Sequence, residues 1–370
     1  MTNRFEAPIT AWYAERARDL PWRRPEAGPW AILVSEFMLQ QTPVARVLPA
    51  YRAWLGRWPT APALAAASPA DAVRQWGRLG YPRRAIRLHE AARIVAERHG
   101  GEVPAGIAEL RALPGVGAYT AAAVASFAFG QRHPVLDTNV RRVLARLVGG
   151  TAQPGGSGAS SAENALADAL LPPAAGGRSA RWSVAVMELG ALVCTSARPA
   201  CGECPVAAGC AWRLNGSPPG AAPQRQASYT GSDRQARGAM LAVLRGAAGP
   251  VPAVALDACW PDPRQRARAL AALIGDGLAC RLPADMVGLP GDPPAPARQP
   301  ADPADQPGPS DQPGPSDQPD PTGPPDRRGT AEPSDRPGPS GPPGAVTLAT
   351  TMARRCRQGN SDGPPMRGRG

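Results

Sequence analysis

The chain contains no lysine, so all 41 basic residues among its 370 are arginine. This absence excludes any mechanism that needs a lysine amine, such as a Schiff base on a sugar or a carbonyl. Aromatic residues are also scarce, at 5% of the chain. No apolar run reaches the roughly 18 residues that a transmembrane helix needs, and residues 1–6 lack the apolar core of a secretory signal. We therefore expect a soluble, cytoplasmic protein that does not bind a membrane.

Proline and glycine, by contrast, are more abundant than one compact domain requires, with 47 and 41 residues. Many lie in residues 289–370, where the hexapeptide Asp-Gln-Pro-Gly-Pro-Ser occupies 305–310 and again 311–316. Such a segment buries too little apolar surface to offset the entropy of ordering it. We expect a disordered tail with no chemistry of its own.

The positive charge is concentrated outside this tail. Residues 290–370 hold nine arginines against ten acidic residues, so the net charge of +11 becomes about +12 on residues 1–289. A basic body whose cations are all guanidinium groups suits a polyanion, above all nucleic acid. GC-rich coding would raise arginine together with alanine, proline and glycine, and composition alone leaves that explanation open.

Residues 1–215 have the apolar spacing of helices joined by short turns, which predicts an all-α fold. Glycine pairs at 100–101, 149–150 and 176–177 mark helix ends. The expected helices are 31–41, 69–77, 82–99, 107–112, 118–129, 138–148, 162–171 and 182–193.

A smaller unit, residues 228–288, follows a linker at 216–227. Its expected helices at 234–245 and 263–274, with short segments at 252–256 and 278–282, resemble a winged helix-turn-helix. Such a unit contacts DNA or docks a partner, although a simple packing appendage fits the pattern nearly as well.

Four cysteines, Cys194, Cys201, Cys204 and Cys210, have the spacing C-x6-C-x2-C-x5-C. Thiols this close in a chain without a secretion signal favour a metal site over disulfides. Four thiolates suit zinc, but zinc ribbons normally use two C-x2-C pairs, whereas an iron–sulfur cubane accepts irregular spacing. The spacing favours an iron–sulfur cluster and leaves zinc open.

Residues 113–117, Leu-Pro-Gly-Val-Gly, separate two expected helices. Gly115 and Gly117 allow positive φ and a close backbone approach. The amides of Gly117 and Ala118 would be free at a helix N-terminus, where a phosphate is readily held. A tight glycine turn is the simpler interpretation. With Val116 between the glycines and the small-residue helix 121–125 behind them, the pattern resembles a helix-hairpin-helix clamp on a DNA backbone.

Two acidic residues stand out by their surroundings. Glu36 shares a helical face with apolar residues at i−4, i−3 and i+3, namely Ile32, Leu33 and Leu39. We expect desolvation to raise its pKa and keep a proton available. Asp137 precedes a helix, as an ordinary N-cap does, and the helix-end amides should hold it ionised. One neutral and one charged carboxyl form the pair that glycosidic bond cleavage needs.

Five sequence blocks follow one another along residues 8–215: Val34-Ser35-Glu36-Phe37-Met38-Leu39-Gln40-Gln41-Thr42, Leu79-Gly80-Tyr81, Leu113-Pro114-Gly115-Val116-Gly117, Leu136-Asp137-Thr138-Asn139-Val140 and the four cysteines. As a set and in this order they resemble the adenine DNA glycosylases of the MutY family, within the endonuclease III superfamily of helix-hairpin-helix glycosylases.

The resemblance implies two helical lobes with DNA and the active site in the cleft between them. Residues 24–133 would form a six-helix barrel that carries the hairpin. Residues 1–23 and 134–215 would form the other lobe, where the four cysteines hold a [4Fe–4S] cluster. The enzyme would be bacterial in type, nucleoid-associated and monomeric, and would act on double-stranded DNA with adenine opposite 8-oxoguanine or guanine.

The resemblance also assigns catalytic roles. The target adenine would be flipped out of the duplex, because its glycosidic bond is shielded in the stack. Glu36 would protonate adenine at N7 and then help to activate water. Asp137 would stabilise the positive charge that develops on the deoxyribose. Tyr119 and Asn139 match positions that assist at the sugar and at these acids.

Further matched positions would contact the substrate. Trp22 and Arg23 fall where the adenine pocket is lined. Gln41, Leu79 and Tyr81 match positions that probe or wedge beside the opposing base, although packing against the barrel also fits Tyr81. Thr42 completes the first block as a further substrate-binding candidate.

Two features of the sequence bear on which activity the resemblance implies. Bifunctional endonuclease III-type enzymes carry a catalytic lysine at the position of Tyr119, so this enzyme should be monofunctional. Nothing after residue 215 supplies the alternating strands of the Nudix-like domain by which many MutY enzymes recognise 8-oxoguanine, and Pro82 replaces a common second aromatic residue. A pyrimidine-mismatch glycosylase of the same superfamily and a noncatalytic iron–sulfur DNA-binding regulator are the alternatives.

Overall fold

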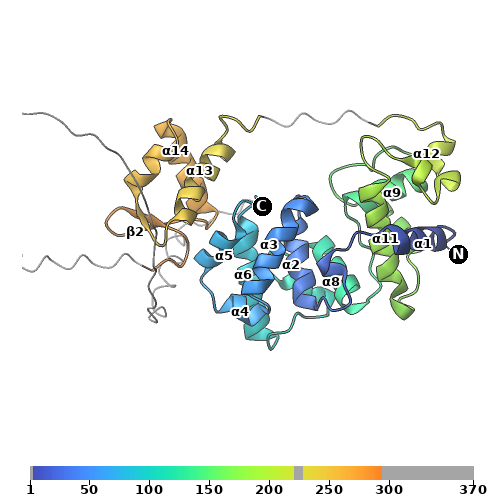
Figure 1. Cartoon of the computed structure of the whole chain (residues 1–370), viewed down its shortest axis with the longest axis horizontal. Helices are drawn as coiled ribbons and strands as arrows, with labels where there is room; N and C mark the ends of the chain where they lie inside the picture. Colours follow the sequence, from blue (N-terminus) through green and yellow to red (C-terminus); the bar gives the residue numbers. More distant parts are fainter. Residues whose placement is uncertain (1–2, 221–227, 294–370) are drawn as a thin grey trace, which may run out of the picture. The chain divides into compact units, whose positions relative to one another are not determined.

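Helices dominate the computed structural model, which describes residues 3–220 and 228–293 (Figure 1). The expected tail beyond residue 293 and most of the linker lie outside the described residues. The first part of the chain forms α1 (Glu6–Arg16), η1 (Pro21–Arg23), α2 (Pro29–Leu39), α3 (Val44–Arg57), α4 (Ala61–Ala65), α5 (Pro69–Trp76), α6 (Arg83–Arg98), α7 (Ile107–Ala112), α8 (Ala118–Phe129), α9 (Thr138–Leu147), α10 (Ser161–Leu170), η2 (Ala175–Gly177), α11 (Arg178–Leu192), η3 (Cys201–Glu203), η4 (Ala207–Gly209) and α12 (Ala211–Leu214).

All the expected helices of residues 1–215 are present, which confirms the all-α class. The helix starts follow local chemistry: the side chains of Ser68, Asp137 and Ser160 accept hydrogen bonds from the first-turn amides of α5, α9 and α10. The sequence patterns missed α1, α3, α4 and α12, and α11 begins at Arg178 rather than at residue 182. None of the described helices combines the length and the apolar character needed to cross a membrane.

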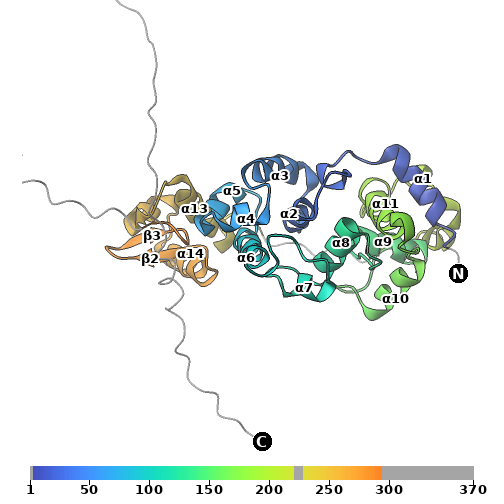
Figure 2. The ribbon, with the colours of Figure 1, turned by 90° about the horizontal axis from the view of Figure 1, so that it is seen from below.

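The helices pack around two hydrophobic cores, one in each lobe. The first core lies among α2 to α8 and is built around Phe37, Trp54 and Trp76; the second contains Ile9 and Trp182. The N-terminal helix α1 packs against α11, far along the chain (Figure 2). The chain therefore passes from one lobe to the other twice, once after α1 and again before α9.

The C-terminal unit contains α13 (Asp233–Gly246), β1 (Val251–Pro252), η5 (Ala253–Cys259), α14 (Pro263–Gly275), β2 (Cys280–Leu282) and β3 (Met286–Gly288). The strands form an antiparallel sheet in the order β1-β3-β2. The order is helix, strand, 3₁₀ helix, helix and two strands, and the small sheet fits a C-terminal unit; its assignment as a winged helix stays a prediction. Apolar residues of α13 and α14 join the core of the first lobe, and Arg74 of α5 forms an ion pair with the buried Asp292.

The hairpin between α7 and α8 has two glycines in different surroundings. Gly115 has φ +83°, and a Cβ there would lie 2.7 Å from a ring atom of Phe37 and 2.9 Å from Cβ of Arg87. Gly117 has φ −85°, and a Cβ there would meet nothing within 4 Å. Gly115 is thus required by packing, while Gly117 leaves the α8 N-terminus open to a ligand.

Replacing Gly115 with alanine should lower the free energy of unfolding by about 2–4 kcal/mol, because the substitution combines a left-handed backbone with a core clash. Gly117→Ala is the matched control and should change it by less than about 0.5 kcal/mol. Thermal unfolding of both variants measures the difference. Equal stability of the two variants would contradict this account of the hairpin.

Candidate active site

A cleft of about 1570 Å³ is lined by η1, α2, the hairpin, α8, α9 and α11. It therefore takes residues from both lobes. The structure brings eleven of the candidate residues to its lining: Trp22, Arg23, Glu36, Gln41, Thr42, Gly115, Gly117, Ala118, Tyr119, Asp137 and Asn139.

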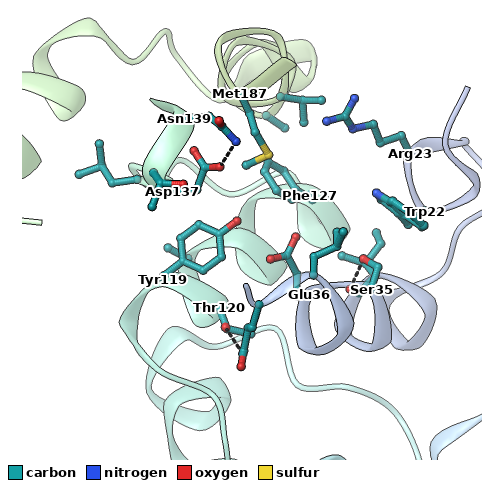
Figure 3. Close-up of a pocket in the computed structure, with 18 of the residues that line it drawn as sticks. Trp22, Arg23, Ser35, Glu36, Tyr119, Thr120, Phe127, Asp137, Asn139 and Met187 are labelled. Carbon is teal, nitrogen blue, oxygen red and sulfur yellow. Dashed lines mark hydrogen bonds between the residues drawn. The ribbon is translucent and has the colours of Figure 1, made fainter. Parts of the chain in front are cut away.

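Glu36 lies on α2 and is only 6% exposed, as its apolar helical neighbours predict. Its carboxyl, the Tyr119 hydroxyl and the Asp137 carboxyl point into one space (Figure 3). Burial raises the pKa of Glu36 to about 7; a hydrogen bond with Tyr119 and the charge of Arg23 oppose this shift, whereas the charge of Asp137 adds to it. Glu36 can therefore hold or release a proton near neutral pH.

Tyr119 is the second residue of α8. Burial raises the pKa of its hydroxyl well above the usual value, and the nearby carboxyls of Glu36 and Asp137 raise it further. The hydroxyl therefore remains neutral and can act as a hydrogen-bond donor between the two acids.

Asp137 is the N-cap of α9, where its Oδ1 accepts a 2.6 Å hydrogen bond from the backbone amide of Val140. Its Oδ2 accepts a second bond, 2.8 Å long, from Nδ2 of Asn139. We expected the helix-end amides to hold Asp137 ionised, but burial is the larger effect and its pKa is raised. The two donors still favour its ionised form, and they distinguish Asp137 from Glu36.

A chain of hydrogen bonds runs from Asp137 to the cysteine loop. Asn139 donates to Asp137 and accepts a 2.8 Å bond from Arg142 at its Oδ1. Arg142 also donates to the backbone carbonyls of Gly190 and Cys194, at 2.7 and 2.8 Å. A Cβ on Gly190 would lie 2.8 Å from that of Asn139, so the glycine allows α9 and α11 to approach closely.

Glu188 of α11 was not expected from the sequence, yet it organises the wall of the cleft. Its carboxylate is fully buried and pairs with Arg18 at 2.6 Å and with Arg23 at 2.8 Å. These two guanidinium groups outweigh burial and lower the pKa of Glu188 to about 2. The segment that carries Trp22 and Arg23 is thereby held against the second lobe. The one feature of the sequence that could have indicated Glu188 was the presence of an acidic residue among the apolar residues of the expected helix 182–193.

Three candidates lie outside the cleft lining. Val116 and Leu79 are buried, at 6% and 5% exposure, and pack in the first core. Tyr81 is 56% exposed, so it does not pack into the first core, and its φ of +47° is left-handed.

The four candidate cysteines line a separate, small apolar cavity together with Arg146 and Trp212. Arg146 donates to Sγ of Cys194 at 3.4 Å and to the carbonyl of Thr195 at 2.8 Å. In residues 3–220 and 228–293, no three acidic, histidine or cysteine side chains converge as a single bound ion requires. Cys356 lies outside the described residues.

Comparison with known proteins identifies the family to which this chain belongs. The family model for the HhH-GPD superfamily base excision DNA repair protein matches residues 34–167. The adenine DNA glycosylase of Mycobacterium tuberculosis (strain CDC 1551 / Oshkosh) is 54% identical over 288 residues, which are 77% of this chain and 93% of that protein. The chain belongs to the adenine DNA glycosylase family.

Other relatives agree with this assignment. Human adenine DNA glycosylase is 44% identical over 214 residues, which are 56% of this chain and 39% of that protein. The structure of a thermostable thymine-DNA glycosylase superposes with a TM-score of 0.52 at 28% identity, covering 57% of this chain and 95% of that one. The glycosylase is thus a base-excision-repair hydrolase with DNA as its partner, and the expected MutY-type enzyme is confirmed. Enzymes of the endonuclease III and MutY type usually carry a [4Fe–4S] cluster.

Replacing Glu188 with glutamine should lower the free energy of unfolding of the glycosylase by about 3–5 kcal/mol at pH 7, because two partly buried guanidinium groups lose their counter-ion. The pKa of Glu188 is lowered from 4.5 to about 2, so this stabilisation is present above pH 4.5 and is lost as the pH falls toward 2. Denaturant unfolding at several pH values measures it. Asp19→Asn, which removes an exposed pair with Arg24, is the control and should change little. Equal losses in both variants would contradict the role of Glu188.

Replacing Glu36 with glutamine should make the folded enzyme more stable above neutral pH, whereas Glu188→Gln should make it less stable. The folded pKa of about 7 lies above the ordinary 4.5, so the folded protein keeps a proton that the unfolded chain has released between these pH values. Stability therefore falls by up to about 3 kcal/mol as the pH rises through this window. Glutamine cannot ionise, so Glu36→Gln should unfold at a higher temperature than the wild type at pH 8 and not at pH 4.5. A pH-independent difference would contradict the raised pKa.

Proposed function

We propose that this enzyme flips adenine opposite 8-oxoguanine or guanine out of duplex DNA, hydrolyses its glycosidic bond as a monomer, and leaves the abasic site intact. One observation carries the proposal: a buried carboxyl with a pKa of about 7 faces a tyrosine and a second, hydrogen-bonded carboxyl in a single cleft. This is the carboxyl pair that glycosidic bond cleavage requires.

In the proposed mechanism Glu36 donates its proton to adenine N7, and the bond between N9 and C1′ of the sugar breaks with its electron pair going to the base. Asp137, with its ionised form favoured by Val140 and Asn139, stabilises the positive charge on the sugar. Water then attacks C1′ and gives a proton to the Glu36 carboxylate, which restores the starting state. Tyr119 orients Glu36 as a neutral donor.

The remaining candidates would bind DNA around this centre. Trp22 and Arg23, held by Glu188, form a wall for the flipped base. The free amides of Gly117 and Ala118 at the N-terminus of α8 suit a backbone phosphate, with Gly115 and Val116 shaping the hairpin. Gln41 and Tyr81 would meet the base opposite adenine, with Leu79 and Thr42 supporting them from the buried side.

A lysine-dependent lyase step is chemically closed to this chain. Such a step needs an amine that forms an imine with the sugar, and the chain has no lysine. Tyr119 occupies the position after the hairpin where a lysine would act.

The four cysteines fit a [4Fe–4S] cluster as a donor set. Cys194, Cys201, Cys204 and Cys210 surround one cavity, and they would bind the irons as thiolates. When bound, the cluster would order the loop between α11 and α12. Arg142 and Arg146 hold this loop through the carbonyls of Cys194 and Thr195.

The proposal predicts the products of single-turnover reactions on duplexes with A opposite 8-oxoguanine, A opposite G, A opposite C and T opposite G. Strands should break at adenine opposite 8-oxoguanine or G, and only after alkali is added, because no lyase step follows base release. Glu36→Gln should reduce this rate by at least about 100-fold while leaving DNA binding intact. Glu97→Gln, an exposed isosteric change on α6, should leave the rate unchanged.

Other outcomes would overturn the proposal in distinct ways. Strand breaks at T opposite G alone would move the enzyme to the pyrimidine-mismatch branch. Breaks without alkali would contradict the monofunctional assignment. DNA binding with no base release, from protein whose visible absorbance shows an intact cluster, would favour a noncatalytic regulator.

A further inference from the structure

The two exposed residues proposed to meet the opposing base share an unusual backbone. Gln41 has φ +54° and Tyr81 has φ +47°, whereas the left-handed region normally favours glycine. Gln41 follows α2, and Tyr81 precedes α6, so the two segments are distant in sequence. Strained residues persist only where the surroundings hold them, and they cluster at functional sites.

One side chain, Arg84 on α6, joins both segments. Its Nη1 donates to the carbonyl oxygens of Phe37, Met38 and Gln40, at 2.7, 3.0 and 2.6 Å. Its Nη2 donates to Oγ1 of Thr42 at 2.9 Å and to the carbonyl of Gly80 at 3.1 Å. The guanidinium therefore holds the residues on both sides of Gln41 and the residue directly before Tyr81.

The surroundings of Arg84 match this holding role. The side chain is 8% exposed, and within the described ranges it forms no ion pair with a carboxylate. The carbonyls at the end of α2 take the place of a counter-ion, since the C-terminus of a helix is its negative pole. The rings of Trp76 and Tyr81 lie 5.2 and 5.4 Å from the guanidinium carbon, so the tyrosine also packs on the group that positions it.

We propose that Arg84 is a positioning residue that holds Gln41 and Tyr81 together in their left-handed conformations, so that both reach the base opposite the target adenine as one unit. This inference rests on the proposed function of these two residues. Lysine could not replace Arg84, because a single ammonium group has three donors at one point and cannot reach both segments in the planar geometry that the guanidinium uses.

The experiment is a double-mutant cycle with single-turnover release of adenine opposite 8-oxoguanine as its readout. Arg84→Lys should lower the rate by at least about 10-fold in the wild-type background, because charge-assisted hydrogen bonds are lost. In a Gln41→Ala/Tyr81→Ala background the same change should cost less than about 2-fold, since Arg84 then has nothing to position. Arg74→Lys on α5, a partly buried arginine that bonds the carbonyl of Ala247 and the carboxylate of Asp292, is the control and should show equal effects in both backgrounds.

Each other result has a definite meaning. A loss that is equally large in both backgrounds would show that Arg84 only stabilises the fold. No loss in either background would show that Arg84 does not position Gln41 and Tyr81. Both results overturn the proposal. Failure of the wild type to release adenine would instead overturn the proposed function.

If rates in the double-alanine background fall below detection, the same cycle is measured in Glu36→Gln protein as the ratio of Kd values for A opposite 8-oxoguanine and A opposite T. If Arg84→Lys does not fold, Thr42→Val removes one acceptor of Arg84 and should give a smaller loss that again vanishes in the double-alanine background.

Discussion

The carboxyl of Glu36 loses its hydration because α2 carries it into a cleft closed by α8 on one side and by η1 on the other. A pKa raised from 4.5 to about 7 means that the folded enzyme is less stable above neutrality than an uncharged residue would make it, by about 3 kcal/mol. The rest of the site keeps that carboxyl in place. Tyr119 supplies a neutral donor, and Glu188 holds Arg23 nearby without letting it form a direct ion pair with Glu36 in the described structure.

The second acid depends on a different device, the helix α9. The backbone amide of Val140 in its first turn donates to the carboxylate of Asp137. Arg142, one turn further on, donates to the side chain of Asn139. Arg142 and Arg146 also bond the cysteine loop. A single short helix thus links Asp137 in the cleft to the loop that carries Cys194. The close packing of Gly190 against Asn139 means that a shift of α11 would be felt at Asp137.

Local patterns were sufficient for part of this site. The apolar neighbours of Glu36 predicted its burial, and the residues after Asp137 predicted its N-cap geometry, because both depend on residues within four positions. The raised pKa of Asp137 was not predicted, since it comes from burial in a cleft that is built from segments far apart in the chain. Arg84 and Glu188 were missed because their partners lie up to 47 and 170 residues away. The helix α3 was missed in part because Pro49 interrupts its pattern.

The absence of lysine has a structural side as well as a chemical one. Arg84, Arg142 and Arg146 are all largely buried, and each bonds several backbone carbonyls without relying on a carboxylate. A guanidinium can do this because its planar fork directs donors to separate acceptors, whereas an ammonium group is a single strongly hydrated point. In this glycosylase Arg84 therefore braces the segment after α2, and Arg142 and Arg146 brace the cysteine loop. The same composition removes the amine that a lyase would need. One property of the sequence therefore underlies both the bracing of these two segments and the end point proposed for the reaction.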